Sequence, residues 1–292
     1  MPPALDLNGK VALITGAARG IGFEAARQMH MRGASVAVVD LDPEQAREAA
    51  ERVGERALGI GADVTDEGAM RAAVAEAVER FGGLDVVVAN AGMAQSQVAT
   101  VRGIAGEEWE RVFEVDMLGV WRTVRAALPQ IVARRGHVVV TGSVYSWANG
   151  VLNSPYAVAK AGVEALGRGL RSELVPLGAS AGVVYYGWVD TQLVQDGFSR
   201  KHSDRMQENV PAWLLKRITP DEAAAALIRG IEARAPRTFA PRWWAIPSYL
   251  RGILNPLLDR RFDRDRRMRE TIRAVEAEAD EQGAAAVSAA SR

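Results

Sequence analysis

The sequence predicts an α/β protein, a single doubly wound domain in which a parallel sheet carries helices on both faces, followed by a C-terminal extension. Over the first 190 residues, short β-branched apolar runs alternate with alanine-rich segments. Each apolar run is continuous, as in a parallel strand that is covered on both faces. The regular strand–helix order indicates one domain built of two similar halves, although 292 residues would allow two domains.

The predicted elements follow one another along the chain. Strands are expected over residues 10–15, 34–40, 56–63, 84–90, 137–142 and 180–186. Helices are expected over residues 20–32, 43–53, 66–81, 107–134 and 155–177. A further helix is expected over residues 220–235, with Thr219 as its N-cap and Pro220 at its first position. We therefore place the sheet domain at residues 1–235.

Two segments break this alternation. Residues 190–217 contain no predicted strand, and a loop of this length in a compact domain is usually functional. Residues 236–292 form the extension. Its part 236–273 is aromatic and holds ten arginines against four acidic residues, whereas 274–292 is acidic, then rich in Ala and Ser, and is expected to fray at its end.

Composition excludes several classes of protein. Basic and acidic residues both number 36, so the charge gives no basis for nucleic acid binding. The chain has no cysteine, which excludes disulfide scaffolds and zinc–thiolate sites. The histidines His30, His137 and His202 are not spaced as ligands, so no metal site is predicted. No membrane span or signal peptide is recognisable, and we expect a cytoplasmic protein.

A glycine-rich turn, TGAARGIG, follows the first predicted strand and opens the first helix. Glycines there allow a tight turn and a close approach to a pyrophosphate, which meets free N–H groups at the helix N-terminus. Asp40 ends the second strand, 18 residues after Gly22, and a carboxylate at this place can bind an adenosine ribose. These features predict a Rossmann-type dinucleotide site, with candidate ligands Gly16, Arg19, Gly20, Ile21, Gly22 and Asp40.

The spacing TGxxxGIG differs from GxGxxG, and with it the chain resembles the short-chain dehydrogenase/reductase family over about residues 7–235. Asp63 and Val64 resemble the pair that contacts adenine in this family. Asn90, Ala91 and Gly92 resemble the family's NAG motif, which closes the fourth strand beside the cofactor. The resemblance implies a Rossmann-fold catalytic domain that binds a nicotinamide cofactor.

The loop after the sixth strand both matches this family and departs from it. Gly187, Val189 and Thr191 match the loop that contacts the nicotinamide carboxamide and the phosphates. Tyr186 stands where the family has proline, and the lost rigidity is expected to loosen the loop.

Three residues carry the expected chemistry. Ser143 ends the fifth strand, and Tyr156 and Lys160 share one face of the next helix at i and i+4. An adjacent ammonium favours the phenolate, so we expect a lowered pKa for the tyrosine, which can then exchange a proton with an alcohol or carbonyl oxygen. The resemblance implies Tyr156 as acid/base, Ser143 as ligand of the substrate oxygen, and Lys160 as the residue that tunes Tyr156 and binds the nicotinamide ribose.

Asp116, 27 residues before Ser143, stands where the resemblance implies an asparagine that supports a water in a proton relay with the lysine. Two interpretations stay open. Either Asp116 maintains the relay, as a carboxylate or as a protonated carboxyl, or it merely pairs with a neighbouring base.

Asp40 and Arg19 point to different cofactors. Arg19 is a basic position that relatives using NADP exploit, whereas the carboxylate of Asp40 repels a 2′-phosphate. We rank NAD ahead of NADP because Asp40 stands where that phosphate would lie.

The candidate substrate-pocket residues are largely aromatic, and residues 190–217 are the expected substrate-binding loop. Aromatic side chains favour a bulky hydrophobic secondary alcohol or ketone, such as an aryl, alicyclic or steroid compound. The alternative for each aromatic residue is a place in the core or in a subunit interface. The candidates are Met93, Gln95, Tyr145, Trp147, Asn149, Val151, Trp188 and Trp213.

The extension 236–273 has no counterpart in the minimal family fold, and the short strand that usually ends this fold is not predicted. A lid or subunit-packing arm is the favoured interpretation. A monotopic membrane element ranks second, because Pro247 and Pro256 interrupt the helix, and a solvated face over 260–269 is the third. Apolar contacts of the arm would come from Trp243, Trp244, Ile246, Leu250, Ile253, Leu254, Leu257 and Leu258.

We therefore expect an NAD-dependent oxidoreductase for a small hydrophobic secondary alcohol or ketone, assembled as a homodimer or homotetramer as is common in the family. One alternative is a catalytically weak NAD(P)-binding regulatory or scaffold protein, suggested by Asp116 and Tyr186. The other is an NADP-dependent carbonyl reductase.

Overall fold

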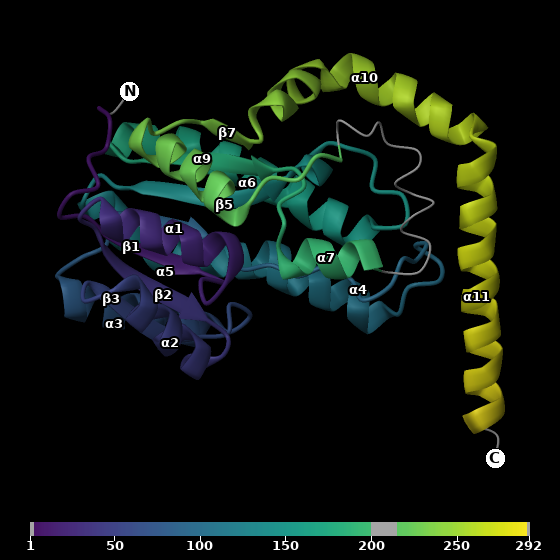
Figure 1. Cartoon of the computed structure of the whole chain (residues 1–292), viewed down its shortest axis with the longest axis horizontal. Helices are drawn as coiled ribbons and strands as arrows, with labels where there is room; N and C mark the ends of the chain where they lie inside the picture. Colours follow the sequence, from purple (N-terminus) through teal and green to yellow (C-terminus); the bar gives the residue numbers. More distant parts are fainter. Residues whose placement is uncertain (1–2, 200–214, 291–292) are drawn as a thin grey trace.

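The computed structural model describes residues 3–199 and 215–290 and confirms the doubly wound α/β fold. All strands pair in parallel, in the order β3-β2-β1-β4-β5-β6-β7 (Figure 1). The strand order reverses between β1 and β4, where the carboxyl ends of the strands leave a crevice for a ligand. The strands are β1 (Val11–Thr15), β2 (Ser35–Asp40), β3 (Ala57–Gly61), β4 (Val86–Ala89), β5 (His137–Ser143), β6 (Ser180–Tyr186) and β7 (Arg237–Ala240).

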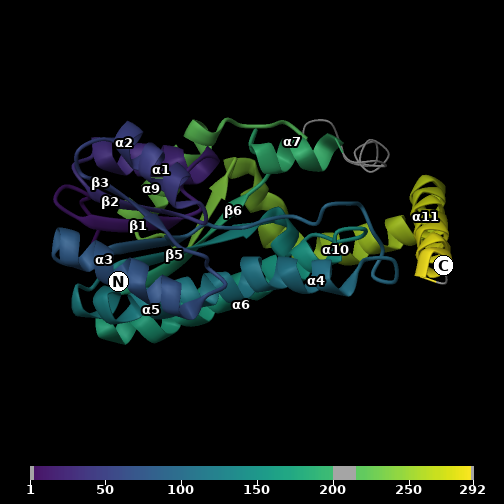
Figure 2. The same cartoon turned by 90° about the horizontal axis from the view of Figure 1, so that it is seen from below.

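Helices cover both faces of the sheet (Figure 2). One face carries α1 (Gly20–Met31), α2 (Pro43–Val53) and α9 (Pro220–Glu232). The other carries α3 (Glu67–Phe81), α4 (Gly106–Phe113), α5 (Val120–Ala133) and α6 (Ser154–Leu174). Alternate residues of β1 enter two separate cores, Leu13 on one face and Ala12 and Ile14 on the other. This double burial is why the strands are continuous apolar runs in the sequence.

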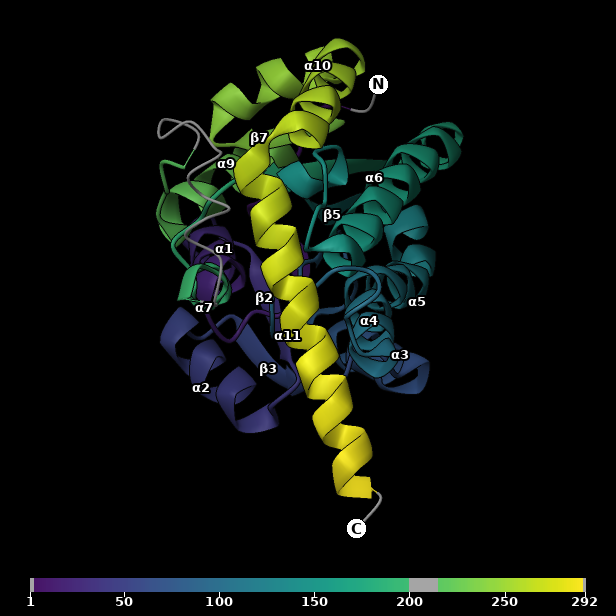
Figure 3. The ribbon, with the colours of Figure 1, turned by 90° about the vertical axis from the view of Figure 1, so that its right-hand side faces the viewer.

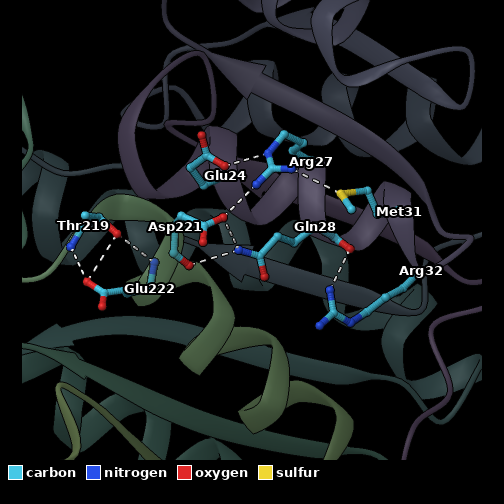
Figure 4. Close-up of polar contacts among 8 residues, drawn as sticks. All are labelled: Glu24, Arg27, Gln28, Met31, Arg32, Thr219, Asp221 and Glu222. Atoms are coloured by element: carbon cyan, nitrogen blue, oxygen red, sulfur yellow. Dashed lines mark hydrogen bonds and ion pairs between the residues drawn. The ribbon is translucent and has the colours of Figure 1, made fainter.

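The predicted start of α9 is confirmed, and it ties α9 to α1 (Figure 4). The Thr219 hydroxyl accepts a hydrogen bond from the Glu222 amide at 3.2 Å, and the Glu222 carboxylate accepts one from the Thr219 amide at 2.8 Å. Asp221, in the first turn of α9, accepts hydrogen bonds from Arg27 and Gln28 of α1 at 2.7 and 2.9 Å. The cap therefore also sets the packing of these two helices.

The single helix predicted over 107–134 is interrupted in the structure. A π-helical segment, Glu114–Gly119, lies between α4 and α5 and contains Asp116, which is fully buried. Such segments insert extra residues into a helix and occur frequently at functional sites. Here the insertion directs a carboxylate into the interior of the domain.

The C-terminal part differs from the sequence prediction in three respects. β7 pairs with β6, so the strand expected to be missing is present; its four residues are too short a run to stand out. α7 (Gln192–Ser199) forms within the expected loop 190–217. The segment 274–292, for which no helix was predicted, is helical up to Ala290, and the fraying at its end stays a prediction.

Two helices form the extension, α10 (Ala245–Arg264) and α11 (Arg266–Ala290). Neither Pro247 nor Pro256 ends α10, contrary to expectation. Pro247 lies in the first turn, where no intrahelical N–H is needed. α11 stands at an angle to α10 at the end of the molecule where α7 lies (Figures 1 and 3). Among residues 3–199 and 215–290, no helix is long and apolar enough to span a bilayer.

Candidate active site

A cleft of about 820 Å³ opens where the carboxyl ends of the strands meet the switch point. The predicted cofactor-binding and catalytic residues come from eight separate parts of the chain, and all of them line this cleft. They are Gly16, Arg19, Gly20, Ile21, Gly22, Asp40, Asp63, Val64, Asn90, Ala91, Gly92, Asp116, Ser143, Tyr156, Lys160, Gly187, Val189 and Thr191.

The glycine turn is shaped by close backbone approach. Gly16 has a φ of 63°, and a Cβ on it would lie 2.8 Å from the Cα of Ala91. A Cβ on Gly22 would overlap the carbonyl oxygen of Gly16 and lie 2.9 Å from Asn90 Nδ2. No side chain caps the first turn of α1, so its amides remain available to an anion. This cradle fits the pyrophosphate of a dinucleotide.

Asn90 ties the NAG motif to the glycine turn. Its side-chain amide donates to the carbonyl oxygens of Thr15 and Gly16 at 3.0 and 3.2 Å. In return, the Thr15 hydroxyl accepts hydrogen bonds from the amides of Asn90 and Ala91 at 3.0 and 3.1 Å. In this structure the motif therefore holds the turn in shape.

Two acidic residues lie at the far end of the cleft. Asp40 accepts hydrogen bonds from the amides of Ala18 and Leu41, each at 2.9 Å, which aim its carboxylate at the glycine turn. The Asp63 carboxylate accepts from the amide and hydroxyl of Thr65, both at 2.8 Å. Partial burial opposes its charge, but these hydrogen bonds hold the pKa of Asp63 below its usual value.

Lys160 and Asp116 form a buried ion pair at the other end. Lys160 Nζ lies 3.0 Å from Asp116 Oδ2 and 3.2 Å from the carbonyl oxygen of Thr141. The second carboxylate oxygen of Asp116 accepts a hydrogen bond from the Met93 amide at 2.7 Å. A Cβ on Gly92 would come within 3.2 Å of the carboxylate, so glycine leaves room for the pair. Asp116 thus connects the lysine to the segment after β4.

The expectation of a lowered pKa for Tyr156 is wrong for this structure. Complete burial raises the pKa of Tyr156, and the charge of Asp116 raises it further, while Lys160 and a hydrogen bond with Ser143 oppose this rise. Burial also raises the pKa of Asp116, against the attraction of Lys160. The spacing in the sequence identified Lys160 as a neighbour of Tyr156. It could not show that burial and the charge of Asp116 raise the pKa of Tyr156 more than Lys160 lowers it.

Among the predicted substrate-pocket residues that the structure describes, Met93 lines the cleft, whereas Gln95, Tyr145, Trp147, Asn149, Val151 and Trp188 do not. Tyr145 packs edge-on against Tyr156, with ring centroids 5.8 Å apart, and against Trp188 at 6.3 Å. Gln95 is buried and donates to the carbonyl oxygens of Gln97 and Leu152 at 2.7 and 2.8 Å. Tyr145 and Trp188 therefore lie beside the catalytic candidates, and Gln95 holds a loop.

The remaining pocket candidates lie toward the extension. Trp147 contacts Trp244, with ring centroids 6.0 Å apart. Asn149 donates to Asp259 of α10 at 2.8 Å and accepts a hydrogen bond from the Val151 amide. Trp213 lies outside the described residues. The segment after Ser143 is thus attached to α10.

Residues 192–196 of α7 line the cleft and belong to the expected substrate-binding loop 190–217, although none of them was singled out. The sequence analysis missed Arg111 of α4, which also lines the cleft, because nothing in its spacing separates it from a surface position. Trp244 was assigned only to packing of the extension, yet a Cβ on Gly187 would lie 2.7 Å from its Cδ1 atom. The glycine at 187 therefore makes room for a residue of the extension. In the described part of the chain, no cluster of three or more His, Cys, Asp or Glu could hold a metal ion.

Comparisons with known proteins agree with this geometry. The family model of short chain dehydrogenases matches residues 10–202. Cis-4-hydroxycyclohexanecarboxylate dehydrogenase of Sinomonas cyclohexanicum is 36% identical over 75% of this chain and 87% of its own. (-)-Trans-carveol dehydrogenase of Rhodococcus erythropolis is 34% identical over 65% and 74%.

A solved structure of 3-ketoacyl-(acyl-carrier-protein) reductase from Brucella melitensis, complexed with NADH, superposes with a TM-score of 0.69. Its sequence is 26% identical, and the match covers 80% of this chain and 97% of that one. The chain belongs to the short-chain dehydrogenase family and is an NAD(P)-dependent oxidoreductase that acts on alcohol and ketone groups.

Proposed function

We propose that this enzyme uses NAD to interconvert a bulky hydrophobic secondary alcohol and its ketone, with Tyr156 as the acid/base. One observation supports this proposal. A single cleft has the glycine turn at one end, and at its other end lie Ser143, Tyr156 and Lys160. A dinucleotide that spans such a cleft brings its nicotinamide to the tyrosine.

Each of these residues has a defined part in ketone reduction. A nicotinamide bound in the cleft supplies the hydride to the carbonyl carbon. The Tyr156 phenol, kept protonated by its raised pKa, donates its proton to the carbonyl oxygen. Ser143, hydrogen-bonded to Tyr156, holds the same oxygen, and the Lys160 ammonium stabilises the phenolate that forms.

Alcohol oxidation runs through the same groups in reverse. The Tyr156 phenolate must then take the proton of the alcohol hydroxyl, so a raised pKa makes this direction more demanding at neutral pH. We therefore propose that oxidation accelerates toward alkaline pH and that reduction predominates near neutrality.

The preference for NAD rests on Asp40. Its carboxylate lies at the end of β2 and is aimed by two backbone amides at the glycine turn, where a 2′-phosphate would meet like charge. Arg19 lines the same cleft and is the residue that would favour NADP. We expect the repulsion by Asp40 to outweigh the attraction by Arg19, because hydrogen bonds hold the Asp40 carboxylate in place.

The substrate class rests on two observations. Tyr145 packs edge-on against Tyr156, and Trp188 packs against Tyr145, so aromatic side chains lie directly behind the tyrosine although neither lines the cleft. The relatives named for cis-4-hydroxycyclohexanecarboxylate and (-)-trans-carveol act on ring alcohols. We propose an alicyclic or aryl-alicyclic alcohol or ketone as the substrate.

The test is a panel of alicyclic, aryl and short linear ketones, assayed with NADH and with NADPH in parallel. The proposal expects the highest kcat/KM for a cyclic ketone with NADH. A preference for linear ketones would refute the substrate class, and higher kcat/KM with NADPH would refute the choice of cofactor. Tight NADH binding without turnover on any ketone would favour a regulatory or scaffold NAD-binding protein, the alternative that Asp116 and Tyr186 suggest.

A further inference from the structure

Helix α10 turns its polar residues toward the protein and its apolar residues away from it. Positions that differ by three and four residues share one face of a helix. Ser248, Arg251, Asn255 and Asp259 follow this spacing, and all four face the domain. An ordinary surface helix has the opposite arrangement.

The inward face is held by polar contacts. Arg251 donates to Glu164 of α6 at 2.9 Å, and this carboxylate is buried. The side-chain amide of Asn255 donates to the carbonyl oxygen of Trp147 at 2.6 Å, and Asp259 accepts from Asn149 at 2.8 Å. These contacts fix the rotation of α10 about its axis, so the same residues always form its outward face.

The outward face carries a large apolar stripe. Ile246, Leu250, Ile253 and Leu257 follow one another at spacings of four, three and four residues, with Tyr249 beside them. Between 46% and 67% of each of these five side chains is exposed. Scattered exposed apolar residues are normal, but a contiguous stripe of this size marks an interaction surface.

Toward the C-terminus of α10, the apolar stripe is followed by positively charged residues. Arg260 and Arg264 follow Leu257 at spacings of three and four residues, and Arg261 lies beside them. All three are exposed, and their guanidinium groups form no ion pair within 3–199 and 215–290. No acidic residue occurs in α10 before Asp259, which faces inward.

We propose that α10 binds the enzyme to the surface of an anionic phospholipid bilayer. In this arrangement Ile246, Leu250, Ile253 and Leu257 enter the boundary between headgroups and acyl chains, while the arginines contact anionic headgroups. α10 is the outermost element along one side of the molecule, as Figures 1 and 3 show, so a flat surface reaches it without meeting other helices.

Charge argues against a second copy of the chain as the occupant. Two α10 helices packed antiparallel about Ile253 would bring Arg264 of one copy to the level of Arg242 of the other. Asp263 is exposed among these arginines but offsets only one of Arg260, Arg261 and Arg264, so this end of each copy keeps a net positive charge. An anionic surface complements the apolar residues and the arginines together.

The test is co-sedimentation with vesicles of phosphatidylcholine and phosphatidylglycerol at a ratio of seven to three, at low salt. Wild type is expected to bind these vesicles and to bind pure phosphatidylcholine at least about tenfold more weakly, since arginines near an anionic surface strengthen binding. Ile253→Gln/Leu257→Gln should lower partitioning by at least about tenfold through lost apolar burial. Arg260→Gln/Arg261→Gln/Arg264→Gln should abolish the preference for the anionic vesicles.

The matched control is Val175→Gln/Leu177→Gln, two exposed apolar residues outside the extension, which should bind as wild type does. Circular dichroism and NADH affinity check that each variant is folded, and neither depends on the substrate. Absence of vesicle binding by wild type would overturn the proposal, as would equal binding by the α10 variants. So would a wild-type oligomer that Ile253→Gln/Leu257→Gln dissociates in the absence of lipid, because a second copy would then cover the stripe.

Discussion

Lys160 Nζ lies 3.0 Å from Asp116 Oδ2, and the two side chains are 3% and 0% exposed. The pair joins α6 to the π-helical segment before α5. Lys160 is therefore shared between a neutral phenol and a carboxylate. Burial raises the pKa of Tyr156, and the cation of Lys160, which also offsets the charge of Asp116, does not cancel this rise.

Asp116→Asn should shift the pH dependence of alcohol oxidation toward acid. The charge of Asp116 raises the pKa of Tyr156, so its removal lowers that pKa, and the phenolate needed for oxidation is present at lower pH. The amide keeps an acceptor for the Met93 amide. Profiles of kcat/KM against pH test this, with Glu79→Gln, an exposed charge on α3, as the control. An alkaline shift would contradict the argument.

Tyr156→Phe should lower turnover by about 10²–10⁴-fold, the usual contribution of general acid–base catalysis, and leave NADH affinity nearly unchanged. Tyr185→Phe is the matched control, because this phenol is stacked on Phe239 at 4.9 Å and does not line the cleft. Steady-state kinetics and NADH fluorescence titration separate the two effects. Retention of more than about a tenth of wild-type turnover by Tyr156→Phe would refute the assignment.

Asp40→Ala should weaken NAD binding and improve NADP binding. The change removes the charge that repels a 2′-phosphate, so Arg19 can bind this phosphate. The ratio of kcat/KM for the two cofactors measures the change. As the control, Asp66→Ala removes a carboxylate that caps α3 outside the cleft, and it should leave this ratio unchanged. If wild type already prefers NADPH, Asp40 does not decide the cofactor.

Gly22→Ala should weaken NADH binding by at least about tenfold and lower the melting temperature. Its Cβ would overlap the Gly16 carbonyl and force the glycine turn apart, and overpacking typically costs about 1–3 kcal/mol. Gly169→Ala, in open space on α6, should instead stabilise the protein by up to about 1 kcal/mol. Equal melting temperatures for the two variants would contradict this difference.

Arg102 fastens α11 to the segment after β4, through ion pairs with Glu276 and, at 3.0 Å, with Asp280. Arg102→Glu should lower the urea midpoint of unfolding slightly, because exposed ion pairs contribute little to stability. Adding Glu276→Arg should recover part of this loss. A double-mutant cycle in urea measures the coupling, and independent effects of the two changes would show that the pair does not hold the helix.

Local patterns in the sequence were sufficient for most of the fold. Continuous apolar runs located six strands, and the Thr219 cap located α9, because these signals depend on residues that are close together in the chain. The glycine turn and the i, i+4 spacing of Tyr156 and Lys160 are equally local, and the structure places them in one cleft.

Contacts between distant residues decided the remainder. The pairing of β7 with β6, the Asp116–Lys160 ion pair and the inverted faces of α10 each depend on what lies opposite in space. The apolar residues of α10 were expected to make the contacts of a lid or a subunit-packing arm. On the side that faces the domain, Glu164, Trp147 and Asn149 instead bind polar residues of the helix. The sequence determined which residues form elements and carry chemistry, whereas burial and approach across the fold determined the pKa of Tyr156 and the direction in which α10 faces.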